Sequence, residues 1–397
     1  EMCIRDSHRR GEIIKISALR RHSMMKRLAK LLYPLLGASI ASGYFMYNRQ
    51  RLLQYNKKTT KKNYPSISII IPARDEEIRL PRLLTSLNQQ SISPEIIVMN
   101  DGSKDNTRVV ALSYGAKVID VVEGDDARWY GKSFACYQGV QYATSDIFIF
   151  IDADVQLLDS HALESILQAY EKQSYRGLLS IQPYHLVKKA YEQFSALFNL
   201  MTVVGMNQFS SLSHHKQTLA FGPVTVMKKE DYVLTQGHKN AECHIIEGFA
   251  LAQAFSKYNL PVSCYEGKGF VGFRMYEEGA KSLIQGWTKH FATGASGTEG
   301  TIMLMIMTWM MGITFSHTLL LFSFITKTVS KKWGGLSYFL YLIQFIRLHK
   351  RVGSFSIVFL IMNPLLFVVF VFVFINSYCQ THFTKNVRWK GRTFKIN

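Results

Sequence analysis

The stretch IFIFIDADV, residues 147–155, joins an unbroken apolar run to two carboxylates. Its first five residues alternate isoleucine and phenylalanine without a polar interruption, which predicts a strand that is buried on both faces. Two carboxylates, Asp152 and Asp154, follow this strand directly. Such a pair either caps a turn or holds a cation, and the surrounding sequence decides between these two interpretations.

Similar apolar runs precede this strand, and helix-like stretches separate them. The runs cover residues 66–73, 95–101 and 116–122, and an amphipathic stretch follows each of them. Short β-rich runs that alternate with helices are typical of a mostly parallel sheet with right-handed crossovers. We therefore predict an α/β domain over residues 64–300, with helices on both faces of a mixed, mostly parallel sheet. Ligands of such sheets bind at the carboxyl ends of the strands.

Polar clusters follow three of these strands at the predicted binding edge. They are the residues Arg74-Asp75-Glu76, Asn100-Asp101 and Asp152-Ala153-Asp154. Each cluster taken alone fits a helix cap or a turn. Three clusters at the carboxyl ends of one sheet favour a nucleotide diphosphate, with Mg²⁺ or Mn²⁺ held by the paired aspartates. The turn WYGK adds Lys132 at a helix start, where it contacts a phosphate oxygen or remains an ordinary solvated lysine.

Composition and charge narrow the class of protein further. The 397 residues contain 47 Lys and Arg against 28 Asp and Glu, a net charge of +19, and 48% are hydrophobic. The basic residues gather near the termini and beside apolar segments, which favours anionic membrane lipids as partners and argues against nucleic acid. The five cysteines show no paired spacing, so we predict neither a disulfide scaffold nor a zinc site.

Apolar segments at both ends predict membrane contact. Residues 28–47 predict an uncleaved transmembrane anchor, and residues 302–326 and 355–378 are each long enough to span a bilayer. Residues 333–348 predict a third span or an interfacial helix. We favour the interfacial helix, which leaves the catalytic domain and the tail together on the cytoplasmic side of the cell membrane.

Three further segments have predictions of their own. Residues 1–23 look like translated vector sequence, so we expect a non-native leader there. Residues 193–213 interleave polar and apolar residues at helical spacing, which predicts either an amphipathic helix on the membrane or a buried core helix. Residues 379–397 form a basic tail behind the C-terminal transmembrane region, 302–378.

The motifs of the sheet resemble those of the family-2 glycosyltransferases, inverting enzymes with the GT-A fold. The resemblance rests on IPARDEE, MNDGSKDNT, WYGK and DADV, in this order. It implies a UDP-sugar donor and a divalent metal. The roles that it implies are Ala73, Arg74 and Glu76 beside the uridine, Asp101 on the uracil, Asp152 on the ribose or metal, and Asp154 on the metal.

Stretches outside these motifs resemble one branch of that family. AFGPVTVMKKEDY at 220–232 and VRWKGR at 387–392 are among them. Members of this branch transfer glucose from UDP-glucose to the carboxylate of a C30 carotenoid acid, a step in staphyloxanthin synthesis. The resemblance implies a membrane-associated enzyme with a lipid-soluble carotenoid acid as acceptor. It also suggests membrane lipids and other carotenoid-pathway enzymes as partners.

The acceptor side departs from the family pattern. Many members carry Glu-Asp-x-x-Leu, in which the aspartate is the general base, but here Gly248 follows Glu247. Either Glu247 acts as the base, or no base is needed, because a carboxylic acid with a pKa of about 4 to 5 is already ionised at neutral pH. We expect Arg274, Lys289 or His290 to orient the acceptor and Trp287 to line its entry.

Four other functions were weighed for this sequence. Processive synthases carry Gln-x-x-Arg-Trp where this chain has 285–289, QGWTK, so a polysaccharide synthase is disfavoured. Phosphatases of the haloacid dehalogenase type also use Asp-x-Asp, but at the end of their first strand. The remaining two are a glycosyltransferase acting on another lipid, such as a polyprenyl phosphate, and an inactive membrane-tethered nucleotide-binding protein.

Overall fold

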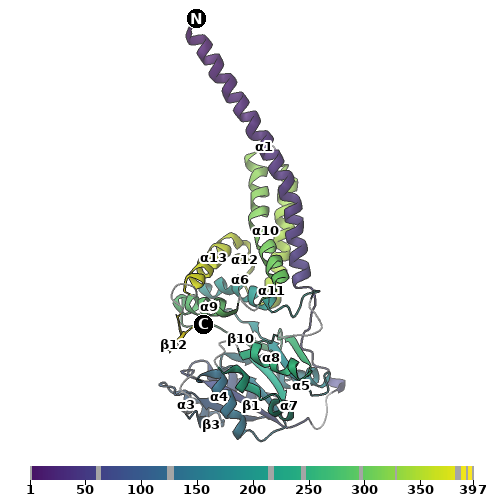
Figure 1. The fold of residues 1–397 in the computed structure, drawn as a ribbon, viewed down its shortest axis with the longest axis vertical. Helices are drawn as coiled ribbons and strands as arrows, with labels where there is room; N and C mark the ends of the chain where they lie inside the picture. The colour runs from purple at the N-terminus through teal and green to yellow at the C-terminus, as the bar shows by residue number, and fades with distance from the viewer. Residues whose placement is uncertain are drawn as a thin grey trace.

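The structure is a computed structural model of the chain. It describes residues 2–59, 64–122, 129–212, 219–242, 247–294, 298–326, 329–380, 386–389 and 392–395. Figure 1 shows an α/β domain at one end of the molecule, a long helical stem at the other, and a layer of shorter helices between them.

A mixed sheet forms the centre of the α/β domain. Among the described residues it has seven strands in the order β3-β2-β1-β4-β8-β6-β9. Neighbouring strands pair in parallel except at β8, which runs antiparallel to both β4 and β6. The strands are β1 (Ile67–Ala73), β2 (Glu95–Asn100), β3 (Lys117–Asp120), β4 (Ile147–Ile151), β6 (Leu178–Gln182), β8 (Val224–Lys228) and β9 (Val262–Glu266). The predicted mostly parallel sheet is confirmed, and the loops after β1, β2 and β4 share one edge.

Alternating side chains of β1 build a core on each face of this sheet. Ile69 and Ile71 pack on one face, whereas Ile70 packs on the opposite face, as the two-residue period of a strand requires. The first face is covered by α2 (Leu80–Asn88), α3 (Thr107–Ser113) and α5 (Ala162–Glu171). The second is covered by α4 (Lys132–Gly139), α7 (Lys229–Leu234) and α8 (Glu247–Lys257). The prediction of helices on both faces is confirmed.

A smaller sheet lies beside the main one, at the end of β4. Its strands are β5 (Val155–Leu157), β10 (Val271–Phe273) and β7 (Tyr184–His185), in the order β5-β10-β7. The short helix η3 (Ala190–Phe194) follows β7 and leads into the helical layer. The tail contains a further strand pair, β11 (Asn386–Trp389) and β12 (Arg392–Lys395).

The stem consists of three long helices that lie side by side (Figure 1). They are α1 (Met2–Met46), α10 (Gly300–Ile325) and α11 (Lys331–Val352). Trp309 on α10 joins its neighbours: its indole donates to Gln344 Oε1 at 3.1 Å, and its carbonyl accepts from Ser39 Oγ at 3.0 Å. Residues 333–348 thus belong to a stem helix, and their assignment as an interfacial helix or a third span stays a prediction. Among the described residues, α10 alone is both long and apolar enough to cross a membrane.

The structure does not confirm the second predicted C-terminal span. Residues 355–378 form two helices, α12 (Ile357–Ile361) and α13 (Asn363–Cys379), and α13 has 17 residues. Pro364 stands in the first turn of α13, where its missing N–H and fixed φ suit the start of a new helix and prevent the continuation of the previous one.

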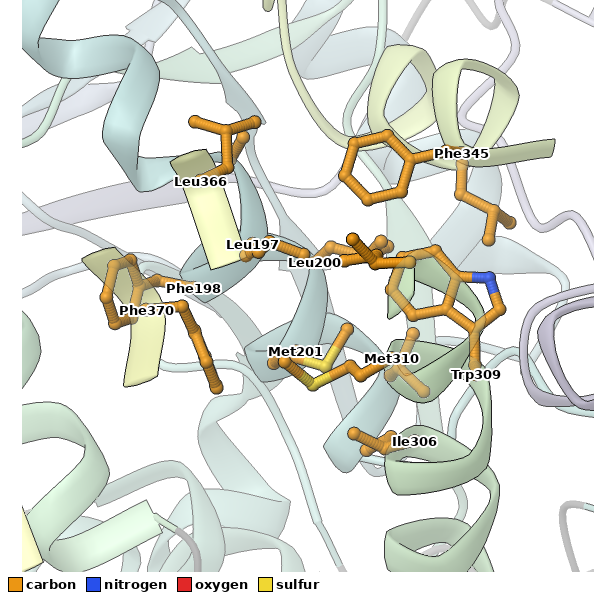
Figure 2. Packing of buried hydrophobic residues seen from close by; sticks show 14 of the residues in the cluster. Leu197, Phe198, Leu200, Met201, Ile306, Trp309, Met310, Phe345, Leu366 and Phe370 are labelled. Atoms are coloured by element: carbon orange, nitrogen blue, oxygen red, sulfur yellow. The ribbon is translucent and has the colours of Figure 1, made fainter. Parts of the chain in front are cut away.

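The helix α6 (Ser195–Gly205) is buried at the centre of the helical layer. Figure 2 shows its side chains packed against residues of α10, α11 and α13. The helix α9 (Ala280–Gly294) also contacts it. Of the two alternatives for residues 193–213, the buried core helix is therefore confirmed, and a helix lying on the membrane is not.

Candidate active site

The loops after β1 and β2 form one rigid unit at the predicted binding edge. The Asp101 amide donates to the Ala73 carbonyl at 2.9 Å. Arg74 Nη1 donates to the Asp101 carbonyl at 3.2 Å and lies 3.8 Å from its carboxylate. Three residues of the predicted nucleotide site, Ala73, Arg74 and Asp101, thus come together.

Reciprocal hydrogen bonds fix these two loops to each other. Asp75 has a left-handed backbone, with φ of 52°. Its amide donates to Ser103 Oγ at 3.1 Å, and its carboxylate accepts from the Lys104 amide at 2.8 Å. The Glu76 amide donates to Thr107 Oγ1 at 2.8 Å. The carboxylate of Glu76, predicted to lie beside the uridine, binds Arg79 at 3.0 Å. Ser103 and Thr107 lie in the motif that our sequence reasoning used, but we assigned them no role.

Asp152 and Asp154 follow β4, as the sequence predicted. Each is tied to a neighbouring strand through its backbone: the Asp152 amide donates to the Pro223 carbonyl at 2.9 Å, and the Asp154 carbonyl accepts from the Arg274 amide at 3.2 Å. Burial, and then the nearby charge of Asp152, raise the pKa of Asp154 to about 7. The two carboxylates therefore repel each other in a partly buried place.

Lys132 lies at the centre of the site. Gly131, with φ of 83°, takes a left-handed backbone that starts α4 and presents Lys132 at its first position. Lys132 Nζ lies 2.6 Å from Asp152 Oδ1, contacts the Glu247 carboxylate, and donates to the Gly222 carbonyl at 3.1 Å. Burial lowers the pKa of Lys132, but Asp152 and Glu247 together hold it above its ordinary value. The sequence predicted Lys132 as a phosphate contact, but it did not predict the ion pair with Glu247 or the hydrogen bond to Gly222. The Gly222-Pro223 pair before β8 was the signal that could have pointed to Gly222.

Gly248 occupies the place of the family's aspartate, and that place has no room for a side chain. A Cβ on Gly248 would lie 2.2 Å from the Ala220 carbonyl oxygen and 3.3 Å from the Gly222 amide nitrogen. Backbone atoms cannot rotate aside as a side chain can. The segment around Ala220 therefore fills the space that a side chain at position 248 would need.

The two aspartates fit a divalent metal that arrives with further ligands. Within the described ranges, no group of three or more His, Cys, Asp or Glu side chains could hold a metal ion. A cation between Asp152 and Asp154 would remove the repulsion that raises the pKa of Asp154. Hard oxygen ligands suit Mg²⁺ and Mn²⁺, and a diphosphate can complete such a set.

The residues predicted for the acceptor side either contact other side chains of the protein or have side chains outside the described residues. Arg274 donates to Glu192 Oε1 through Nε at 3.1 Å and through Nη2 at 2.6 Å, and to Glu277 through Nη1 at 3.0 Å. The Trp287 side chain is 2% exposed; it donates to Ser195 Oγ at 3.0 Å and stacks on Phe198. It therefore packs between α9 and α6. The side chains of Lys289 and His290 lie outside the described residues.

Comparison with known proteins identifies the family of the chain. The family described as glycosyl transferase family 2 matches residues 68–214. A 4,4'-diaponeurosporenoate glycosyltransferase from Staphylococcus haemolyticus is 58% identical over 374 residues, which cover 94% of this chain and 100% of the relative. The protein with the same name from Staphylococcus aureus strain USA300 is 49% identical, over 94% of this chain and 99% of the relative. The chain belongs to glycosyl transferase family 2.

The family match covers the first part of the α/β domain of this glycosyltransferase. Residues 68–214 include the loops after β1, β2 and β4, whereas Glu247 and Gly248 lie beyond the match. Among solved structures, a mannosyltransferase from Pyrobaculum calidifontis, in complex with GDP-mannose and Mn²⁺, aligns with 91% of this chain and 99% of its own at a TM-score of 0.49 and 12% identity.

Proposed function

We propose that this glycosyltransferase moves glucose from UDP-glucose to the carboxylate of a C30 carotenoid acid, 4,4'-diaponeurosporenoate. One observation carries the proposal: a relative named for that acceptor is 58% identical over its whole length. The filled space beside Gly248 supports it, because an acceptor that is already ionised can react without a base in that position.

The donor half has the groups that a UDP-sugar needs. Ala73, Arg74, Glu76 and Asp101 are assigned to the nucleoside end, because their loops are held rigidly at the strand edge. Asp152 and Asp154 are assigned to a divalent metal. When bound, that metal neutralises negative charge on the departing diphosphate. Lys132 lies within reach of the same place and adds a second positive charge.

The reaction then needs no proton transfer from the acceptor. One carboxylate oxygen of the acceptor attacks the anomeric carbon, the bond from that carbon to the diphosphate oxygen breaks, and UDP leaves with the bonding electrons. The configuration inverts and a glucosyl ester forms. Glu247 is held by Lys132, so we assign it no role as a base.

The outer surface of the helices supports a membrane location. Large apolar side chains of the stem are exposed, among them Leu31 at 62%, Leu304 at 65% and Phe324 at 67%. The outer face of α13 is similar, with Val368 at 63% and Phe372 at 65% exposed. We propose that the stem enters the bilayer, that α12 and α13 lie at its surface, and that the α/β domain faces the cytoplasm, so that a polyene acceptor reaches the site from the lipid.

The test is to incubate the purified full chain in liposomes with radiolabelled UDP-glucose and the carotenoid acid, with and without Mn²⁺. We expect label in a lipid-soluble product that mild alkali releases, as it does a sugar ester, and loss of that label with EDTA or in Asp154→Asn. Label in an alkali-stable product formed from a polyprenyl phosphate would assign the enzyme to another acceptor. UDP binding without transfer to either lipid would favour the inactive nucleotide-binding alternative.

A further inference from the structure

The ammonium group of Lys132 joins the donor side of the site to the acceptor side. Its three protons face three oxygens: Asp152 Oδ1 at 2.6 Å, the carboxylate of Glu247, and the Gly222 carbonyl at 3.1 Å. Asp152 is also a predicted metal ligand. Lys132 and a divalent cation are therefore alternative positive charges for the same carboxylate.

The surroundings of Lys132 allow this exchange. The Lys132 and Asp152 side chains are 31% and 27% exposed, so a ligand from solvent can reach both. Glu247 is only 9% exposed and also pairs with Lys132. It can keep the ammonium group in the site when Asp152 takes another partner. A metal that approaches without a diphosphate must break the ion pair and stand beside an ammonium group, and both costs are electrostatic.

We propose that Lys132 is an internal counter-ion that keeps a divalent metal from Asp152 until a UDP-sugar binds. The inference rests on the proposed function, because the diphosphate is the group that draws Lys132 away. Its oxygens offer the ammonium group a new partner of the same charge as Asp152. Asp152 then exchanges the ammonium group for the metal, so metal and donor bind together and either one alone binds weakly.

The experiment measures Mn²⁺ binding to the purified full chain by the electron paramagnetic resonance signal of free Mn²⁺, without and with saturating UDP. Lys132→Met removes the charge and keeps the length, and a thioether is a poor ligand for Mn²⁺. We expect Mn²⁺ alone to bind at least about tenfold more tightly to Lys132→Met than to the parent chain. The factor by which UDP tightens Mn²⁺ binding should fall by a similar amount.

A matched control is Lys228→Met. Lys228 is 32% exposed and pairs with Glu230 at 2.9 Å, at the other end of β8 from Gly222. We expect parent-like Mn²⁺ binding. In the double variant Lys132→Met with Asp152→Asn, the gain should disappear, which assigns the gained site to Asp152. Melting temperatures of all variants check that each is folded.

The outcomes separate this inference from the proposed function. Unchanged binding of Mn²⁺ alone in folded Lys132→Met would overturn the counter-ion role, even if the parent chain transfers glucose from UDP-glucose. An equal gain with and without UDP would also overturn it, since that is the effect of net charge alone. A parent chain that binds no UDP would overturn the proposed donor, whereas the comparison with Mn²⁺ alone would still test Lys132.

Discussion

We propose that a single residue, Gly248, separates this site from one that activates a hydroxyl group. Its missing Cβ lets the Ala220 carbonyl approach to a distance that no other residue permits. Glu247, the adjacent carboxylate, is already paired with Lys132. Among the described residues, the carboxylate next to Gly248 is thus held by an ammonium group, which supports the proposal that the acceptor reacts without a base.

Gly248→Ala and Gly248→Asp test this point. Both add a Cβ that would lie 2.2 Å from a backbone oxygen, so we expect each to lower the free energy of unfolding by about 1–3 kcal/mol and to reduce transfer. The measurements are SDS-induced unfolding in mixed micelles and the transfer assay. Gly335→Ala on α11, where nothing lies within 4 Å, is the control and should be neutral or slightly stabilising. A Gly248→Asp variant with raised transfer would contradict the account.

His185 predicts a pH dependence of stability. It is fully buried between the rings of Phe273 and Phe355, and burial lowers its pKa to about 4, although Glu192 acts in the opposite direction. An unfolded histidine titrates at about 6.5, so between these values the unfolded state binds more protons and stability falls as the pH drops. At pH 5 the loss is about 2 kcal/mol.

His185→Phe should remove this loss, because phenylalanine fills the same space without binding a proton. Melting temperatures at pH 7 and pH 5 give the measurement, and His161→Phe, at a half-buried surface position, is the control that should keep the parent's difference. An unchanged pH dependence in His185→Phe would show that His185 does not carry it.

At the scale of elements, the strands could be predicted from sequence because local pattern determines them. The run at 147–151 and its two aspartates fold as β4 and its rim, and Gly131 starts α4 where WYGK indicated. The pairing of Lys132 with Glu247 could not be predicted from local pattern, because the two residues are 115 positions apart in the sequence (247 − 132).

The helical layer was harder to predict than the sheet. A hydropathy sum over residues 355–378 counts their apolar side chains, but it does not show that a new helix begins there with Pro364 in its first turn. Hydropathy also cannot distinguish a helix that faces lipid from one that packs against other helices, which is why residues 193–213 had two interpretations. The burial of Trp287 depends on α6, because its hydrogen-bond partner is Ser195, 92 residues earlier.

The outer face of α13 gives a prediction at this scale. Val368→Lys places a charge at a 63% exposed position that we assign to the membrane surface, where it should cost up to about 3 kcal/mol. We expect transfer to the carotenoid acid in liposomes to fall at least about tenfold, while transfer to a short acceptor acid in detergent stays unchanged. Val109→Lys on α3, at a 64% exposed position, should match the parent in both assays. Equal activity of Val368→Lys and Val109→Lys in liposomes would place α13 in water.

For the whole molecule, one buried ion pair joins the stem to the α/β domain. Arg351, near the end of α11, binds Glu266 at the end of β9 with distances of 2.5 and 2.7 Å. Arg351 Nη1 also donates to the Tyr47 carbonyl at 2.8 Å, and the Tyr47 hydroxyl donates to Glu266 at 2.8 Å. The end of α1, the edge of the main sheet and the end of α11 thus meet at one point.

Arg351→Met should uncouple these parts, because it leaves a buried carboxylate without its charge partner. The Arg351 and Glu266 side chains are 10% and 4% exposed, so we expect a loss of about 3 kcal/mol or more in SDS-induced unfolding. Arg108→Met breaks an exposed pair with Asp120, with side chains 48% and 60% exposed, and should cost less than about 1 kcal/mol. Equal losses would mean that the junction does not depend on this pair.

We propose that the site transfers glucose to an ionised carboxylate and that its described residues provide no base for a hydroxyl group. The most direct measurement compares kcat/KM for the carotenoid acid and for the alcohol made by reducing its carboxyl group, in the parent chain and in Glu247→Gln. We predict a preference for the acid of at least about 100-fold, as expected when a positioned base is missing, and the same preference in Glu247→Gln. Comparable rates for acid and alcohol, with the alcohol rate lost in Glu247→Gln, would show that Glu247 is a base and would contradict the account.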